Sequence, residues 1–420
     1  MPTADQKAPR RNYSALVAAY ALRLHTAAGD GHHVVSPLGA WLLLALAAPL
    51  AKGSDREELE RVLGCDADTA RRAADEMLKH PHPVLALAFA AWHSSDVGVA
   101  LDAWLRSLPS CATAGPMPTQ AQADAWAREQ TKGQIESMPV AISEDARLLL
   151  ATAVATEVSW QKVFELVPAP ELGGPWASRV NRVMRRYGHE PVKVVARTEA
   201  AGLVGVCREQ GQGGLDVISV IAAPDVPPER VLAAAYDVAA RLAGLRSTAD
   251  FVGAFDLPLT GHSWIVRECV IEASSALGRI ENSEVTLPAW AAQTELDDLT
   301  TAPGTGFPEL ARAVLGQLLP DPRGDRASAS QVARARFDTN GFSAAALTML
   351  FTASAAMPPP PRRTIMRTVE VRFDRPFAVV AATNTRELSS GRTTLLQGLP
   401  AFGAWVTEPM EPSEPIKRWD

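Results

Sequence analysis

Cysteine is scarce in this sequence: four cysteines are scattered through 420 residues, and no Cys-x-x-Cys motif occurs. Closely spaced cysteines would indicate a zinc site or, in a small chain, a disulfide framework. Neither is expected here, and the cysteines are interpreted as buried thiols. They are Cys65, Cys111, Cys207 and Cys269.

Long apolar runs are absent as well. Residues 1–7 are polar and charged, unlike the apolar core of a signal peptide. The most apolar stretch, Pro37 to Ala51, is interrupted by Pro49 and is too short to cross a membrane. The sequence therefore predicts a soluble protein without a membrane partner, located in the cytoplasm. Export by a route that needs no classical signal is the alternative.

The sequence has no excess of positive charge, because it contains 47 acidic and 41 basic residues and its formal net charge is -6. This balance argues against nucleic acid as the main partner. Hydrophobic residues make up 47% of the chain and charged residues 21%, which is typical of a globular protein and not of a disordered one.

Motifs of enzymes and metal sites are also missing. No Gly-x-Ser-x-Gly elbow or Walker loop occurs, and Gly211–Gly214 is better explained as a hairpin turn. The histidine pairs His32–His33 and His80–His82 have no cysteine or carboxylate cluster beside them, so they are expected at the surface. The sequence predicts no catalytic residues, no cofactor, no metal site and a function other than catalysis.

Helical patterns dominate the first third of the chain and strand patterns the last half, without regular alternation of the two, which favours an α+β fold. The segment Leu148–Phe164 is apolar throughout and could be a buried strand or a helix by periodicity alone. Helices are predicted at residues 12–28, 37–50, 54–63, 67–79, 119–138, 228–242 and 307–319, and strands at 84–92, 192–195, 215–222 and 285–288.

The segment Phe337–Thr348 carries the most functional information. A strand-like start reaches a turn at Asp338–Gly341, and a run of small residues follows it. Small side chains in series suit a segment that slides between neighbours, because each added volume is felt in a close-packed interior. On its own, Ala344–Ala346 is more simply explained as part of a helix in an alanine-rich chain.

Together with Val371–Phe377 downstream, this segment resembles the hinge, the exposed loop and the following strand of the serpins. Further blocks of the sequence resemble serpin motifs in the right order, from the start of the central helix to the C-terminal strand. They are Val35–Leu38, Ala51–Leu63, Trp126 with Thr131–Ile135, Leu150–Trp160 with Phe164, and Phe402, Gly403, Val406 and Pro409.

The resemblance covers residues 12–410 as a single domain of a divergent, bacterial-type serpin. It implies an α+β fold with three β-sheets, about eight to nine helices and an exposed reactive-centre loop at about residues 341–370. Residues 1–11 and 411–420 are expected to be flexible termini. Trp160 is expected beside the point where the loop enters the sheet.

The family is known for inhibiting serine proteases as single-use substrates. A target protease attacks a bond in the exposed loop and forms an acyl-enzyme, and the freed loop then inserts into the main sheet as an extra strand. The resemblance therefore implies a serine protease as partner, a monomeric inhibitor and no catalytic residues in this chain. The alternative is a non-inhibitory serpin that acts as a binding or chaperone-like protein and whose loop is only cleaved.

The spacing typical of the family places the attacked bond between Ala355 and Ala356, fourteen residues beyond Gly341. A small residue there favours an elastase-like or subtilisin-like protease. The loop is longer than usual and contains the stiff, basic segment Pro358–Arg363. Arg362 and Arg363 are thus the second choice, for a trypsin-like protease, unless they only belong to a solvated loop.

The hinge departs from the family pattern at several positions. Thr339 and Asn340 replace an acidic pair, and Phe342 replaces a small residue, so its volume is expected to slow insertion. Ala344 and Ala346 are the next inward-facing positions and fit insertion well. The whole hinge is predicted as Thr339, Asn340, Gly341, Phe342, Ser343, Ala344, Ala345 and Ala346.

A second departure concerns the place where the main sheet opens. Thr152 and Gln331 stand where serpins usually have a hydrogen-bonded asparagine and histidine, and Gly39 replaces a serine while Ser36 is kept. We expect Thr152 and Gln331 to form a substitute hydrogen bond that controls opening, because either group alone would be costly to bury. The simpler interpretation is that Gln331 faces solvent. The predicted sheet-opening cluster is Ser36, Gly39, Thr152 and Gln331.

Overall fold

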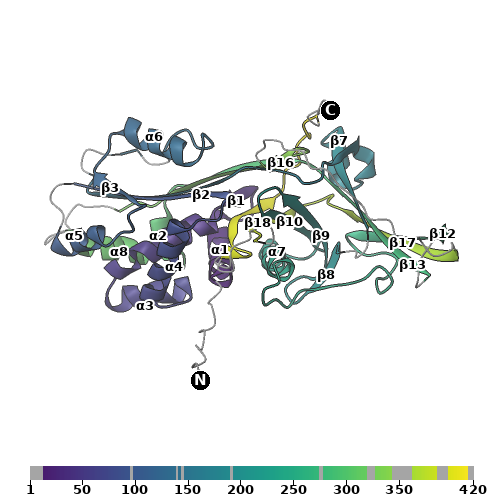
Figure 1. The fold of residues 1–420 in the computed structure, drawn as a ribbon, viewed down its shortest axis with the longest axis horizontal. Helices are drawn as coiled ribbons and strands as arrows, with labels where there is room; N and C mark the ends of the chain where they lie inside the picture. Colours follow the sequence, from purple (N-terminus) through teal and green to yellow (C-terminus); the bar gives the residue numbers. More distant parts are fainter. Residues whose placement is uncertain are drawn as a thin grey trace, which may run out of the picture.

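The computed structural model describes residues 13–94, 98–138, 141–142, 146–189, 193–273, 278–318, 327–342, 362–385 and 396–414. Most of the helices gather at one end of an elongated molecule, and a β-sheet forms the other end (Figure 1). The α-helices are α1 (Ser14–Ala28), α2 (Pro37–Ala47), α3 (Gly53–Leu63), α4 (Ala67–Lys79), α5 (Val99–Arg106), α6 (Gln120–Gln130), α7 (Pro228–Leu242) and α8 (Phe307–Leu318).

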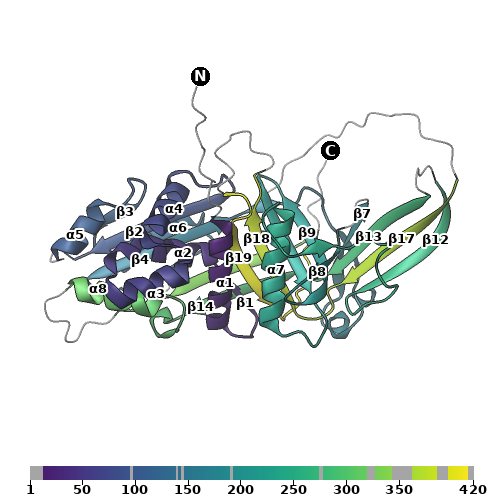
Figure 2. The same ribbon diagram turned by 90° about the horizontal axis from the view of Figure 1, so that it is seen from below.

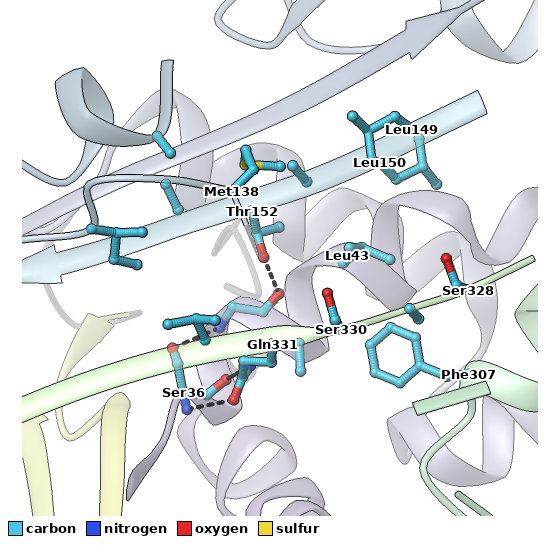
Figure 3. A pocket seen from close by; sticks show the side chains of 18 of the residues that line it. Ser36, Leu43, Met138, Leu149, Leu150, Thr152, Phe307, Ser328, Ser330 and Gln331 are labelled. Atoms are coloured by element: carbon cyan, nitrogen blue, oxygen red, sulfur yellow. Dashed lines mark hydrogen bonds between the residues drawn. The ribbon is translucent and has the colours of Figure 1, made fainter. Parts of the chain in front are cut away.

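The central helix α2 is buried along nearly its whole length, as expected for a helix that is apolar on all sides. Its first turn is fixed by local chemistry, because Ser36 caps the helix by accepting a hydrogen bond from the Gly39 backbone N–H and Pro37 occupies the first helical position. This first turn points toward the main sheet and so places Ser36 and Gly39 at the candidate site (Figure 3).

A seven-stranded sheet forms the middle of the molecule in the order β1-β19-β18-β10-β9-β8-β11. Its strands β10, β18 and β19 are buried at every position, and α7 packs on it beside β10 and β18 (Figure 2). The strands are β1 (His33–Val35), β8 (Val195–Thr198), β9 (Gly202–Gly211), β10 (Leu215–Ile221), β11 (Asp250–Phe251), β18 (Phe377–Thr383) and β19 (Pro400–Val406).

A five-stranded sheet extends away from the helices in the order β12-β17-β13-β7-β6 (Figure 2). Strand β17 is its second strand and pairs antiparallel with β12 and parallel with β13. The strands are β6 (Glu165–Pro168), β7 (Arg182–His189), β12 (Trp264–Ala273), β13 (Arg279–Leu287) and β17 (Arg362–Arg372).

The remaining strands form two smaller sheets that are the halves of one main sheet. One half has the order β3-β2-β4 and the other β14-β15-β16-β5. The halves share one stretch of chain, because β5 follows β4 after a single residue, Glu157. When these two halves are counted as one sheet, the four hydrogen-bonded sheets correspond to the three sheets that were predicted. The strands are β2 (Leu85–His93), β3 (Thr113–Pro116), β4 (Leu148–Thr156), β5 (Val158–Ser159), β14 (Trp290–Leu296), β15 (Gln331–Phe337) and β16 (Gly341–Phe342).

Several local expectations need correction. Helix α3 begins at Gly53, one residue before the predicted start, and no side chain caps its N-terminus. Helix α6 ends at Gln130, because the backbone reverses at Lys132 and Gly133, both of which have positive φ. Cys111 and Cys269 are exposed, whereas His33 and His82, which were expected at the surface, are buried.

Candidate functional site

The two halves of the main sheet face each other across an open space. Strand β4 pairs only with β2, and β15 pairs with β16 at the single position Phe337↔Phe342, as far as the structure describes the chain. The free edge of β4 and the part of the β15 edge that precedes Phe337 thus have backbone N–H and C=O groups without strand partners. Two strand edges of this kind are ready to accept one further strand between them.

A cavity of about 530 Å³ occupies this space and is called here the interstrand cavity. Its walls are β4 and β15, its floor includes α2 and α8, and α6 lies above it (Figures 1 and 3). The lining is mainly apolar, with hydroxyl groups from Ser328 and Ser330 on the β15 side. The Ser330 hydroxyl is buried and has no hydrogen-bond partner among the described residues, as expected of a group beside an incomplete sheet.

The predicted sheet-opening cluster lies at one wall of the interstrand cavity, and the structure brings its four residues together (Figure 3). The Thr152 hydroxyl donates to the backbone carbonyl of Gly39 at 3.0 Å. The Gln331 amide makes two bonds to Ser36, accepting from its N–H at 2.9 Å and donating to its carbonyl at 3.0 Å. The Ser36 hydroxyl in turn donates to Ala401 of β19 at 3.1 Å.

This geometry corrects the predicted hydrogen bond between Thr152 and Gln331. Each side chain bonds the first turn of α2 instead, so β4 and β15 are anchored separately to one helix. Gln331 does not simply face solvent either, because both ends of its amide are bonded. Gly39 leaves room for this arrangement: a Cβ atom there would lie 3.2 Å from Val154 Cγ2 and 3.3 Å from the Thr152 hydroxyl.

Trp160 directly follows β5 and lies where β16 joins the main sheet. It is buried, and its indole N–H donates to the carbonyl of Asp338 at 2.7 Å. Its ring packs on Phe337, with 4.9 Å between the ring centroids. A tryptophan fixed at both its polar and its apolar end defines the position of the hinge turn, residues 338–340.

The first hinge residues are already part of the main sheet. Gly341 pairs with Ser159, and Phe342 pairs with Val158 on one side and Phe337 on the other. A Cβ atom at Gly341 would lie 2.2 Å from the Val158 carbonyl oxygen, so only glycine fits there. The Phe342 ring is buried between Trp290 and Phe402, at 6.4 Å from each centroid.

Some of the remaining predicted loop residues lie outside the part of the chain that the structure describes, and others lie in a strand. Ser343, Ala344, Ala345, Ala346, Ala355 and Ala356 lie outside the described residues. Arg362 and Arg363 lie in β17, paired with Ala273 and Glu272 of β12. The expectation of a loop to about residue 370, or of a solvated loop around the two arginines, is therefore wrong from residue 362 onward.

The C-terminal segment Pro409–Glu414 is a part of the site that the sequence did not reveal. Residues 411–414 were expected in a flexible terminus, but they bond the hinge turn. The Ser413 N–H and hydroxyl both donate to the Asp338 carboxylate, at 2.8 and 2.6 Å. Burial raises the pKa of Asp338, but hydrogen bonds from Ser413 and Arg336 outweigh it and hold the pKa below its ordinary value.

The described residues show neither a group of side chains arranged to hold a metal ion nor a helix long and apolar enough to cross a membrane. The titratable groups with the largest departures from ordinary pKa values lie elsewhere. Burial lowers the pKa of His25, which is hydrogen-bonded to His33 and Tyr236 beside β19. None of these three residues lines the interstrand cavity.

Residues 15–167 match the family model of the serpins, described as serine protease inhibitors. Among solved structures, the chain resembles the thermophilic serpin tengpin in its native state, with 13% identity, a TM-score of 0.59 and coverage of 97% of this chain and 95% of tengpin. A serpin from the trematode Schistosoma haematobium matches with 13% identity and a TM-score of 0.57, covering 95% of this chain and 99% of that one.

Human thyroxine-binding globulin is similar to the same extent, with 13% identity, a TM-score of 0.58 and coverage of 95% of this chain and 99% of the globulin. A search of curated protein sequences finds no match. At these identities the structural matches show the fold alone, and they extend the serpin fold from the N-terminal part to nearly the whole chain.

Proposed function

We propose that this chain is a serpin and that it inhibits serine proteases as a single-use substrate. The protease serine attacks the carbonyl carbon of Ala355, the bond to the nitrogen of Ala356 breaks, and an ester joins the protease to Ala355. The new end of the loop then inserts into the main sheet before water can hydrolyse the ester. The chain supplies the substrate bond and the inserting strand and has no catalytic role.

The observation that carries this proposal is the interstrand cavity with an open strand edge on each side. One added strand would satisfy the free backbone groups of both β4 and β15, and that gain would drive insertion. Strand β16 already occupies the end of this space. Continued in the same register, Ala344 comes to lie opposite Ala335 of β15 and Thr156 of β4.

The side chains that would enter the interior also support insertion. Phe342 shares the inward face with Phe337 and is already accommodated, so its volume is not an obstacle at the first step. Strand alternation puts Ala344 and Ala346 on the same inward face. In the same register, Thr348 would lie opposite Gln331, at the anchors on α2.

The placement of β17 bears on the choice of protease. A protease binds an extended segment of several residues around the cleaved bond, and Arg362 and Arg363 are paired with β12. Presenting either arginine would require unpairing of the strand, which makes a trypsin-like protease the less favoured target. The small residue Ala355 favours an elastase-like or subtilisin-like protease with a small or shallow specificity pocket.

A non-inhibitory serpin is the second candidate. It is favoured by the long proline-rich segment after Ala356. The fold also occurs in thyroxine-binding globulin, which has been solved in complex with thyroxine. In this alternative the loop is cleaved but no protease remains attached.

The test is incubation with elastase-, subtilisin- and trypsin-like proteases, followed by denaturing electrophoresis and intact mass. We expect a denaturant-resistant complex with one of the first two and a released fragment that begins at Ala356. A protease whose serine has been blocked is the control and must form no complex. Clean cleavage without any complex would overturn inhibition in favour of the second candidate.

A further inference from the structure

The segment Pro409–Glu414, called here the C-terminal strap, crosses the upper ends of several strands. Its Met410 N–H donates to the carbonyl of Ala289 at 2.7 Å, next to the start of β14. Further along, Glu411 and Glu414 both pair with Arg182 at the start of β7. Glu411 also accepts from the Asn181 N–H at 2.7 Å. The strap is therefore attached to both the main sheet and the five-stranded sheet.

Between these attachments the C-terminal strap bonds every residue of the hinge turn. Ser413 donates twice to Asp338, as described above, and its carbonyl accepts from the Thr339 hydroxyl at 2.9 Å. The Glu414 carbonyl accepts from the Asn340 side-chain amide at 3.1 Å. Asp338 and Thr339 are buried, with 7% and 0% of their surface exposed. Hydrogen bonds with one charged partner, such as those that Ser413 donates to the Asp338 carboxylate, are among the stronger ones in proteins.

Strand β16, which follows the hinge turn, makes fewer interactions than the turn itself. Strand β16 has two residues, pairs with β15 at one position and with β5 at two, and then leaves the described part of the chain. Pairing over so few residues is not stable by itself. The hinge is also held by two bonds from Trp160, whose indole N–H donates to the Asp338 carbonyl and whose backbone N–H donates to the Asn340 carbonyl at 3.3 Å. Arg336 pairs with the Asp338 carboxylate, and the Phe342 ring is buried.

We propose that the C-terminal strap is a lock on the hinge: it fixes residues 338–340 and thereby keeps Gly341 and Phe342 paired in the main sheet. When the strap is released, these two residues leave the sheet, and the loop that a protease can reach becomes longer. The strap is thus an autoinhibitory contact that limits the reactivity of the intact protein. Its effect on protease reaction rests on the proposed function, whereas its effect on the hinge does not.

The lock is tested by hydrogen exchange of the backbone amides, measured by mass spectrometry on the intact protein. A chain ending at Met410 removes the bonds of residues 411–414, and a chain ending at Glu414 is the matched control that keeps them. We expect exchange at residues 339–342 to be about tenfold faster in the shorter chain, with no change in the β2–β4 pair. Equal exchange in the two chains would overturn the lock.

A point variant keeps the test decisive if the shorter chain does not fold. Ser413→Ala removes only the hydroxyl bonds to Asp338 and Arg336. Glu408→Gln is its control, because it changes an exposed residue just before the C-terminal strap. Ser413→Ala should raise exchange at residues 339–342 by a smaller factor, and Glu408→Gln should leave it unchanged. Equal exchange in these two variants would also overturn the lock.

Cleavage by a subtilisin-like protease separates the lock from the proposed function. The lock predicts that the loop of the chain ending at Met410 is cut several-fold faster than that of its control. Faster exchange and faster cutting without a stable protease complex would support the lock and overturn inhibition. A stable complex with unchanged exchange would do the opposite.

Discussion

The side-chain amide of Gln331 exchanges two hydrogen bonds with the backbone of Ser36, accepting from its N–H at 2.9 Å and donating to its carbonyl at 3.0 Å. Gln331 begins β15, and Ser36 caps the central helix α2. The open edge of β15 is therefore held in place by a helix beneath the sheet and not by the opposite strand. Thr152 holds β4 in the same way through the carbonyl of Gly39.

Separate anchors predict nearly additive effects of mutation. Gln331→Ala leaves the Ser36 N–H and carbonyl without these partners, and Thr152→Val removes one hydroxyl bond. Each change should lower the free energy of unfolding of the intact protein by about 1–3 kcal/mol, because buried polar groups lose their partners. The temperature at which the loop inserts spontaneously should fall as well, since both sheet halves become freer to move.

The double variant Gln331→Ala/Thr152→Val measures the coupling between the two residues. We expect the two losses to add within about 0.5 kcal/mol, as for residues that do not touch. Urea unfolding of the four proteins gives the coupling energy. A coupling above about 1 kcal/mol would show that Thr152 and Gln331 interact directly. An unchanged insertion temperature in Gln331→Ala would show that its anchor does not control sheet opening.

The sequence predicted the elements around this site better than their contacts. The Ser36 cap is visible in the sequence because it is local: a serine, a proline and an apolar run suffice to predict it. The family resemblance predicted that Thr152 and Gln331 lie in one cluster at the place where the sheet opens. It did not predict their partners, because which backbone groups at the start of α2 the two side chains can reach depends on how the helix packs. The Ser36 carbonyl, for example, accepts from Gln331 although it also accepts the helical bond from the Ala40 N–H.

Two other parts of the site were beyond sequence reasoning for different reasons. The tail after Pro409 is short, polar and rich in proline, so it has no periodicity from which contacts with Asp338 could be predicted. Strand β17 does show a partial alternation, with Val369 and Val371 buried, but its first residues adjoin Pro358–Pro361 and were assigned to the loop. The apolar stretch at Leu148–Phe164 became the strands β4 and β5 because of its neighbours and not its own pattern.

Phe342 is predicted to stabilise the intact hinge. Phe342→Ala removes a ring that is 3% exposed and packs against Trp290 and Phe402. We expect the free energy of unfolding to fall by about 3 kcal/mol, as for other buried aromatic residues replaced by alanine. Leu259→Ala is the control, because Leu259 is 55% exposed and should lose little. Similar losses in the two variants, measured in urea, would contradict a packing role for the Phe342 ring.

The buried His25 is predicted to make stability depend on pH. Burial, with a contribution from His33, lowers the pKa of His25 well below its ordinary value. In the unfolded chain, histidine takes up a proton as the pH falls through about 6.5, while the folded protein keeps His25 neutral. The unfolded state thus binds more protons, so stability is full above this pH and declines below it.

The expected decline due to His25 is roughly 1 kcal/mol per pH unit between about pH 6.5 and the lower pKa of the folded state. Urea unfolding at pH 7.5, 6.5 and 5.5 measures it. His25→Gln can still bond His33 and Tyr236 but cannot titrate, so its stability should depend less on pH. His80→Gln changes an exposed histidine and is the control. An equal pH dependence in His25→Gln and the unchanged protein would contradict this role.

Insertion into the interstrand cavity predicts opposite outcomes for two neighbouring substitutions. Ala344 would face inward, like Phe342, between Ala335 and Thr156, whereas Ala345 would face outward beside the exposed Arg334. Ala344→Glu would require burial of a carboxylate opposite the uncharged residues Ala335 and Thr156, so insertion would be slow. Ala345→Glu places the same charge on the other face and should allow insertion.

On the proposed inhibitory function, we therefore expect Ala344→Glu to behave only as a substrate: the loop is cut, the ester is hydrolysed, and the yield of the denaturant-resistant complex falls by about tenfold or more. Ala345→Glu should retain the complex. The measurement is the ratio of complex to cleaved protein on a denaturing gel with a subtilisin-like protease. Cleavage at equal rates in both variants would show that the loop binds the protease normally in each. Equal complex yields would contradict the register, because the two positions differ only in the face that they present to the sheet.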